Sequence, residues 1–247
     1  AQRLQGGLVE DLRDEAHVLV DQDLASVADR DAGRLLAAVL QRVDAVVGEL
    51  GDFLTGCPHA KYAALFTGFL IGLLAGHDVV LLGERGQGKT RLLRTLALLL
   101  DEWTPVIAGS ELGEHPYEPI TPVSIRRAGE LGDDLPVAWR HRSERYAEKL
   151  ATPDTSVADL VGDVDPVKVA EGRSLGDPET IHFGLVPRAH RGIVAINELP
   201  DLAERIQVSL LNVMEERDIQ VRGYTLRLPL DVLVAASANP EDYTNRG

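Results

Sequence analysis

One stretch of the sequence limits the fold more than any other: residues 77–100, HDVVLLGERGQGKTRLLRTLALLL. Its first part, 77–83, is short, apolar and contains β-branched residues, which predicts a strand. Residues 90–100 repeat leucine at helical spacing, which predicts a helix with one apolar face. Between them, GERGQGKT at 83–90 has the spacing G-x-x-x-x-G-K-[ST] of a phosphate-binding loop, in the strand-loop-helix setting that this motif requires.

The residue types in this loop predict its chemistry. Glycines let the backbone turn and aim N–H groups at phosphate oxygens, and the positive end of the following helix adds to the attraction. Lys89 is expected to reach the β- and γ-phosphates of ATP as a catalytic group, and the Thr90 hydroxyl is expected to bind Mg²⁺. The residues predicted to bind nucleotide are Gly83, Glu84, Arg85, Gly86, Gln87, Gly88, Lys89, Thr90 and Arg91.

Two later apolar strands end in polar residues suited to hydrolysis. IVAINELP at 193–200 ends its strand in Asn197 and Glu198, and DVLVAASAN at 231–239 ends in Asn239. Ligands bind at the carboxyl ends of strands in parallel α/β sheets. Glu198 is therefore the candidate base for the attacking water, and Asn239 is expected to hold the γ-phosphate and that water in line.

The sequence resembles the AAA+ ATPases from about residue 60 to 247, in particular the branch of the magnesium-chelatase motor subunit and the MoxR-like ATPases. GERGQGKT corresponds to Walker A, IVAINEL to Walker B and ASANPEDY to sensor 1. Residues 158–199 resemble the hairpin-bearing insert in that family's second helix, and residues 214–240 resemble its hairpin before sensor 1. Alternation in IQV and TLRL about a glycine independently predicts the second hairpin.

The resemblance implies a P-loop AAA+ core, an α/β fold with a mostly parallel sheet flanked by helices. It also implies a homo-oligomeric ring, usually a hexamer, with ATP between neighbours, and a partner protein that carries a von Willebrand A domain. Lys89, Thr90, Glu198 and Asn239 each match a motif position of the family.

Three features depart from the family pattern. Asn197 stands where Walker B has Asp, so this amide is expected to hold Mg²⁺ through water. The loss of a charge there predicts a slow or Mg²⁺-demanding ATPase rather than an inactive one. The chain is also expected to lack the last core strand, the arginine finger and the C-terminal lid, and 124–150 is expected to be a solvated or subunit-facing insertion.

The composition limits the kinds of molecule that the chain is expected to bind and its expected location in the cell. The net charge of −14 disfavours nucleic acid and anionic membranes as non-specific partners. The longest apolar run, 62–75, is shorter than the roughly 20 residues of a membrane span, so no span is expected. The single Cys57 indicates no internal disulfide and favours a cytoplasmic location.

Apolar periodicity divides the chain into an N-terminal helical segment, 1–58, and the nucleotide-binding core, 59–247. Helices are expected at 8–50, 61–75, 140–150 and 201–217, and a further strand at 104–109.

The sequence leaves several functions open. The leading hypothesis is an ATP-driven remodelling motor of the MoxR-like kind, which acts on a protein or helps to mature a metalloenzyme. The alternatives are the magnesium-chelatase motor, which drives Mg²⁺ insertion into a porphyrin, and a nucleotide-gated scaffold with little hydrolysis. Sigma-factor activators share the fold, but their GAFTGA loop is absent from this sequence.

Overall fold

The computed structural model describes residues 77–172, 178–216, 219–221, 224–226 and 228–240. Contacts divide the chain into two compact units, Val80–Thr90 with Asp101–Gly247, and Ala1–Val79 with Arg91–Leu100. The site described below lies wholly in the first of these units. The helices expected at 8–50 and 61–75 fall outside the described residues.

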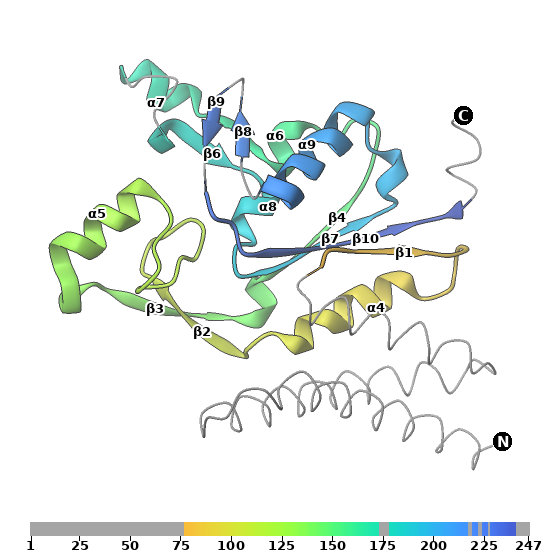
Figure 1. The fold of residues 1–247 in the computed structure, drawn as a ribbon, viewed down its shortest axis with the longest axis horizontal. Coiled ribbons are helices and arrows are strands. Elements are labelled where there is room, and N and C mark those ends of the chain that lie inside the picture. The colour runs from red at the N-terminus through yellow and green to blue at the C-terminus, as the bar shows by residue number, and fades with distance from the viewer. Residues whose placement is uncertain (1–76, 173–177, 217–218, 222–223, 227, 241–247) are drawn as a thin grey trace, which may run out of the picture. The chain divides into compact units, whose positions relative to one another are not determined.

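A four-stranded sheet forms the centre of the fold, with the order β1-β10-β7-β4 (Figure 1). Both pairings β10–β7 and β4–β7 are parallel, so the expected mostly parallel α/β sheet is confirmed. The strands are β1 (Val79–Leu82), β10 (Val232–Ala238), β7 (Gly192–Asn197) and β4 (Tyr146–Leu150).

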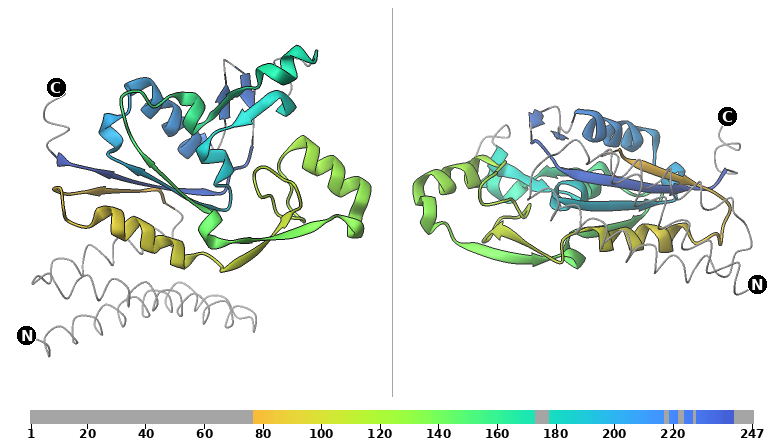
Figure 2. Two further views of the ribbon diagram at one scale, coloured as in Figure 1. Left: turned by 180° about the vertical axis from the view of Figure 1, so that it is seen from behind. Right: turned by 60° about the horizontal axis from the view of Figure 1, so that its bottom comes forward.

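Strand β7 is buried along its whole length, which explains why its sequence is a continuous apolar run rather than an alternation. Its register with β10 pairs Val194 with Val234 and Ile196 with Ala236. These four residues share one face and belong to the main apolar cluster. Helix α9 (Glu204–Glu216) packs on the same cluster through Ile206, Leu210 and Val213 (Figure 2). The alternate positions, including Asn197 and Ser237, therefore face the opposite side of the sheet.

The helix expected at 140–150 is wrong. Residues 137–141 form β3 (Val137–His141), a 3₁₀ turn η3 (Arg142–Glu144) follows, and 146–150 form β4 of the central sheet. Glu, Lys and Ala favour helix locally, but pairing of β4 with β7 overrides that preference. Among the described strands, β4 pairs on one side only, with β7, and charged residues are common on such edge strands.

The expectation of a solvated or subunit-facing insertion at 124–150 is wrong for residues 146–150, because they form β4 of the central sheet. The strand expected at 104–109 does form, as β2 (Trp103–Ile107), but outside the main sheet. It pairs antiparallel with β3, with Trp103 opposite His141 and Ile107 opposite Val137. Helix α5 (Pro122–Leu131) and the turn η2 (Gly132–Asp134) lie between these two strands in sequence.

Two further antiparallel hairpins match the expected inserts. Strands β5 (Gly162–Val164) and β6 (Ile181–Phe183) pair between short helices α6 (Val157–Leu160) and α8 (Leu185–Arg188). Strands β8 (Ile219–Val221) and β9 (Tyr224–Leu226) pair between α9 and β10. The remaining elements are α4 (Lys89–Thr95), η1 (Leu96–Leu99), α7 (Pro166–Ala170), η4 (Pro178–Thr180) and η5 (Leu199–Asp201).

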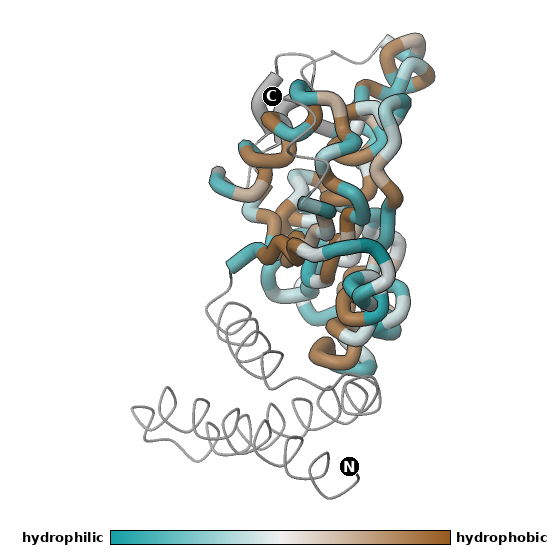
Figure 3. The backbone as a smooth tube through the Cα atoms, turned by 90° about the vertical axis from the view of Figure 1, so that its right-hand side faces the viewer, coloured by the Kyte–Doolittle hydropathy of each residue, from teal (hydrophilic) through white to brown (hydrophobic). Residues whose placement is uncertain are grey.

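Local sequence explains several of these boundaries. Thr121 caps α5 by accepting a hydrogen bond from the Ser124 N–H, and Pro122 follows at the first helical position. Ser156 and Asp159 form a capping box at α6. Hydropathy follows the same organisation, with brown apolar stretches interrupted by teal loops and helix faces along the backbone (Figure 3). Within the described residues, no helix is both long and apolar enough to cross a membrane.

Candidate nucleotide and magnesium site

The glycine-rich loop begins where β1 ends, beside the end of β10. The Gly83 N–H donates to the Ala238 carbonyl at 3.2 Å. Gly86 and Gly88 adopt φ values of +81° and +76°, a region that side chains other than glycine rarely occupy. The loop side chains of Glu84, Arg85 and Gln87 are exposed. Arg91 belongs to the other compact unit.

Lys89 begins α4 and its ammonium points back over the loop. It donates to the Gly83 carbonyl at 2.5 Å, the Glu84 carbonyl at 2.8 Å and Oδ1 of Asn239 at 2.9 Å. An ammonium has three donors, and here each has an oxygen acceptor from the protein. Lys89 thus connects the loop to the end of β10.

Thr90 contacts the end of β7. Its hydroxyl donates to Oδ1 of Asn197 at 3.2 Å, and the hydroxyl of Ser237 donates to the same oxygen at 3.2 Å. Asn197 and Ser237 are almost fully buried, 8% and 1% exposed. The amide at position 197 therefore stands between the loop and the sheet, where a Walker B carboxylate would stand.

The other end of that amide meets a carboxylate from the next strand. Nδ2 of Asn197 donates to Oε1 of Glu148 at 2.9 Å. Glu148 lies in β4 opposite Ala195, two residues before Asn197 in the neighbouring strand, so both side chains lie on one face of the sheet. The second oxygen of Glu148 accepts from the Tyr146 hydroxyl at 3.3 Å.

Glu198 follows β7 with a left-handed backbone, φ +57° and ψ +48°. Non-glycine residues in this region are uncommon, and such strain concentrates at functional sites. Its N–H donates to the Ser237 hydroxyl at 3.3 Å, and its carboxylate accepts from Nδ2 of Asn239 at 2.5 Å. The structure therefore brings together Lys89, Thr90, Asn197, Glu198 and Asn239, as strand-end reasoning predicts.

Asn197 and Glu198 do not lie on the strand next to the loop strand, because β10 lies between β1 and β7. Asn239, at the end of β10, is therefore central and contacts both Lys89 and Glu198.

The oxygen-rich donor set fits Mg²⁺ held together with phosphates. Thr90, Asn197 and Glu198 offer hydroxyl, amide and carboxylate oxygens, the ligands that magnesium prefers. In the described part of the chain, no group of three or more His, Cys, Asp or Glu residues is arranged to hold a metal alone. Such a site suits an ion that arrives with ATP, because Mg²⁺ usually keeps waters and substrate phosphates as ligands.

Sequence reasoning missed Glu148 and Ser237. Glu148 was hidden by the helix predicted at 140–150, because only a strand places it beside Asn197. Ser237 lies within the run DVLVAASAN, two residues before Asn239, and period-two alternation along that strand could have assigned it to the same face.

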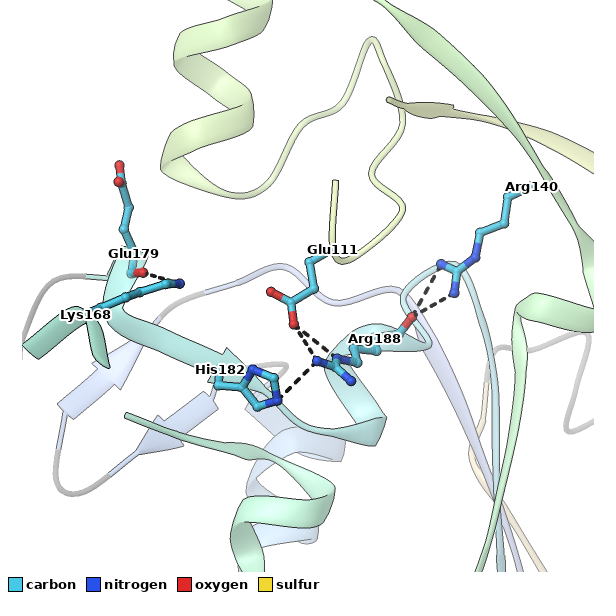
Figure 4. A network of polar contacts seen from close by, with 6 residues as sticks. All are labelled: Glu111, Arg140, Lys168, Glu179, His182 and Arg188. Carbon is cyan, nitrogen blue, oxygen red and sulfur yellow. Dashed lines mark hydrogen bonds and ion pairs between the residues drawn. The ribbon is translucent and has the colours of Figure 1, made fainter. Parts of the chain in front are cut away.

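A polar network on another part of this unit attaches the β2–β3 segment to the β5–β6 hairpin. Arg188 of α8 donates to Glu111 at 2.7 and 3.1 Å and lies 3.2 Å from His182 of β6 (Figure 4). Lys168 donates to the Glu179 carbonyl at 2.8 Å in the same view. These contacts hold the segment after β2 against α8 and the β5–β6 hairpin, and they involve none of the strand-end residues above.

Glu114 and His190 are buried ionisable groups that lie outside the strand-end site. Burial raises the pKa of Glu114, but hydrogen bonds from Ser110, Ser124, Thr121 and Ile120 outweigh it and leave the pKa below its ordinary value. Burial lowers the pKa of His190, whose Nδ1 accepts from the Asp231 N–H at 3.1 Å. Both groups support the fold around the loops that follow β2 and precede β10.

Taken together, a glycine loop at the end of β1 and polar groups at the ends of β7 and β10 define the P-loop AAA+ class of nucleotide-binding domains. The Sigma-54 interaction domain family matches residues 171–245, which include the second half of this site.

Within this class of nucleotide-binding domains, the chain is similar to subunits of magnesium chelatase. The chain is 27% identical over 168 residues to the magnesium-chelatase subunit ChlI of Anabaena variabilis, covering 66% of this chain and 47% of that protein. It is 30% identical over 176 residues to the magnesium-chelatase 38 kDa subunit of Cereibacter sphaeroides, covering 66% and 45%. The chain is thus similar to AAA+ subunits of magnesium chelatase, and it spans less than half the length of these two relatives.

A solved structure shows the same fold. A chain in a cryo-EM-based model of the complex between the BchI and BchD subunits of magnesium chelatase matches with a TM-score of 0.50 and 22% identity. The match covers 70% of this chain and 51% of that one.

Proposed function

We propose that this chain binds and hydrolyses Mg·ATP as the motor domain of a magnesium-chelatase-type AAA+ machine. The observation that carries the proposal is the continuous set of hydrogen bonds from Lys89 through Asn239 to Glu198. It joins a phosphate-binding lysine to a water-activating carboxylate, with Thr90 and Asn197 beside it.

Nucleotide binding falls to the loop from Gly83 to Thr90. Its backbone N–H groups would hold phosphate oxygens, and Lys89 would exchange protein oxygens for the β- and γ-phosphates. Bound Mg²⁺ neutralises phosphate charge as ATP is cleaved. Thr90 would offer its oxygen to the ion while it donates its proton to Asn197, since a hydroxyl can donate and accept at once.

Glu198 would orient and deprotonate the attacking water, and Asn239 would position Glu198. The left-handed backbone at Glu198 and the hydrogen bond that its N–H donates to the Ser237 hydroxyl fix the point from which its side chain extends. Asn239 is 3% exposed and contacts both Lys89 and Glu198, so a single amide aligns the two groups.

The comparisons favour the magnesium-chelatase alternative over the MoxR-like remodelling motor, because the relatives cited above are chelatase subunits. A homo-oligomeric ring and a partner subunit with a von Willebrand A domain remain part of the proposal. So does the porphyrin as the acceptor of the inserted ion.

Binding of ATP and release of phosphate by the full-length protein test the proposal directly. Lys89→Ala should abolish tight Mg·ATP binding in calorimetry, whereas Lys168→Ala, which removes a lysine outside the site, should leave it unchanged. Equal affinity in the wild type and Lys89→Ala would rule out the loop as the nucleotide site.

Two measurements separate the motor types. Stimulation of ATP turnover by a porphyrin together with partner subunits would support the chelatase reading. Capture of a von Willebrand A protein by Glu198→Gln in ATP, without any porphyrin effect, would support the MoxR-like reading. An isolated homo-oligomer with no turnover would support the scaffold.

A further inference from the structure

Position 197, where Walker B has a negatively charged Asp, is a neutral Asn in this chain, but the neighbouring strand β4 carries a carboxylate, Glu148. Glu148 of β4 ends with Oε1 2.9 Å from Nδ2 of Asn197, and Oδ1 of the same amide lies 3.2 Å from the Thr90 hydroxyl. One side chain therefore spans from the carboxylate to the residue expected to bind Mg²⁺.

The chemistry of these partners fixes which way the amide points. A carboxylate can only accept hydrogen bonds, so the NH₂ end of Asn197 must face Glu148 and its oxygen must face Thr90. The two hydroxyls on the other side, from Thr90 and Ser237, can both donate to that oxygen. Without an acceptor at 148, the amide would lose the contact that keeps its oxygen toward the loop.

The contact between Glu148 and Asn197 is fixed by the pairing of β4 with β7 and does not depend on two mobile surface side chains. Parallel register places Leu150 opposite Asn197 and Glu148 opposite Ala195, so both polar side chains emerge on the face away from α9. Asn197 is buried, and Glu148 is partly buried and also accepts from the Tyr146 hydroxyl.

We infer that Glu148 is a positioning residue for the Mg²⁺ of the nucleotide complex, supplying from β4 the negative charge that Asn197 lacks and holding the Asn197 oxygen toward Thr90. This inference rests on the proposed function. The negative charge that a Walker B aspartate would carry is then supplied by Glu148, and Asn197 lies between that charge and Thr90. The Asn197 amide transmits the effect of this charge, because a hydrogen bond donated to a carboxylate polarises the amide and makes its oxygen more negative.

The test measures the Mg²⁺ dependence of nucleotide binding rather than turnover. A fluorescent ATP analogue is titrated into the full-length protein across a Mg²⁺ series and in EDTA. Glu148→Gln keeps an oxygen that can accept from Asn197 but removes the charge. It should raise the Mg²⁺ concentration for half-maximal binding by about fivefold or more, with affinity in EDTA unchanged.

Two further variants separate a charge effect from a folding effect. In Asn197→Asp/Glu148→Gln the charge returns to strand β7. The hydrogen bond between positions 197 and 148 can re-form in the reverse direction, while the hydroxyls of Thr90 and Ser237 still donate to position 197. The Mg²⁺ requirement should therefore return near the wild-type value. Glu130→Gln removes one exposed carboxylate on α5, outside the site, and should change nothing. If Glu148→Gln does not fold, Glu148→Asp and Glu148→Asn form a size-matched pair, and only the Asn variant should need more Mg²⁺.

Distinct results separate failure of the inference from failure of the proposed function. A Mg²⁺ requirement that is the same in Glu148→Gln and the wild type would overturn the inference. So would an equal rise in Glu130→Gln, or a loss of binding in EDTA as large as the loss in Mg²⁺. Wild-type protein that binds no nucleotide at any Mg²⁺ concentration would instead overturn the proposed function.

Discussion

The side-chain amide of Asn239 donates a 2.5 Å hydrogen bond to the carboxylate of Glu198, 41 positions earlier in the chain. The contact crosses from the end of β10 to the end of β7, so it forms only when the two strands lie side by side. It leaves one carboxylate oxygen of Glu198 for a water molecule.

Glu198→Gln should bind Mg·ATP as the wild type does and lose hydrolysis. The amide keeps the size of the side chain but cannot accept a proton from water, and loss of a general base typically lowers the rate by about 10²- to 10⁴-fold. Phosphate release under single-turnover conditions, with binding measured in parallel, is the check. Unchanged turnover would remove Glu198 from the mechanism.

Asn239→Ala should lower kcat by about 10²-fold with a smaller effect on ATP affinity. The change deprives Glu198 of its donor and Lys89 of one of three acceptors, while the loop backbone is untouched. Steady-state kinetics with saturating Mg²⁺ would show this pattern. A variant with normal kcat and weakened binding would mean that Asn239 serves the phosphates alone.

Asn197→Asp should reduce stability by about 1–3 kcal/mol, even if it binds Mg²⁺ more tightly. The new carboxylate would face the carboxylate of Glu148 with no donor between them. Adding Glu148→Gln should recover most of the loss. Urea unfolding of the two single variants and the double variant gives the coupling energy between the two positions. Additive effects would show that the two side chains do not interact.

Glu114→Gln should destabilise the protein at neutral pH by about 1–3 kcal/mol. The carboxylate accepts hydrogen bonds from two backbone N–H groups and three hydroxyls, and it is 1% exposed. Its folded pKa lies below the ordinary 4.5, so its ionised form stabilises the fold above that pH, and the contribution falls as pH drops through the folded pKa.

Urea midpoints of the wild type and Glu114→Gln should therefore converge as the pH is lowered below 4.5. Glu118→Gln, an exposed position in the same loop, is the matched control and should follow the wild type throughout. A constant difference between wild type and Glu114→Gln at every pH would assign the effect to packing instead.

Acidification should weaken the fold through His190. This residue is 4% exposed and its pKa is below the ordinary 6.5. Burial is the largest cause, and the positive charges of Arg191 and Arg140 act with it, against Asp231 and Glu114. Below pH 6.5 the unfolded chain binds a proton that the folded chain excludes, so stability falls as pH drops, by at most about 1.4 kcal/mol per pH unit.

His190→Asn keeps an acceptor for the Asp231 N–H but cannot titrate. Its unfolding free energy should therefore change less than that of the wild type between pH 7.5 and 5.5, roughly one unit on either side of the ordinary value. Parallel pH profiles for the two proteins would remove His190 as the source of the dependence.

The sequence predicts those parts of the site in which local pattern and chemistry coincide. The loop 83–90 combines a motif with a strand before it and a helix after it, so its position follows from local information. Asn197, Glu198 and Asn239 follow from the rule that polar groups at the ends of parallel strands gather at one edge.

The parts of the fold that the sequence did not predict depend on pairing between strands that are far apart in the chain. Tyr146–Leu150 reads as helix because Ala, Glu and Lys favour helix, and only pairing with β7 makes it a strand. That error concealed Glu148, whose carboxylate accepts a hydrogen bond from the Asn197 amide. Likewise, β2 is a strand by its own composition, but nothing in its residues shows that it pairs with β3 outside the main sheet.

The position of Asn239 has a consequence for timing. Its two ends hold Lys89 and Glu198 at once, so a phosphate that draws Lys89 away must break one of these bonds. The amide can then turn toward the phosphate only by changing its hold on Glu198. Under the proposed function, movement of Lys89 to a phosphate would therefore release one of the two groups that Asn239 connects, and the arrival of nucleotide would reach Glu198 through one side chain.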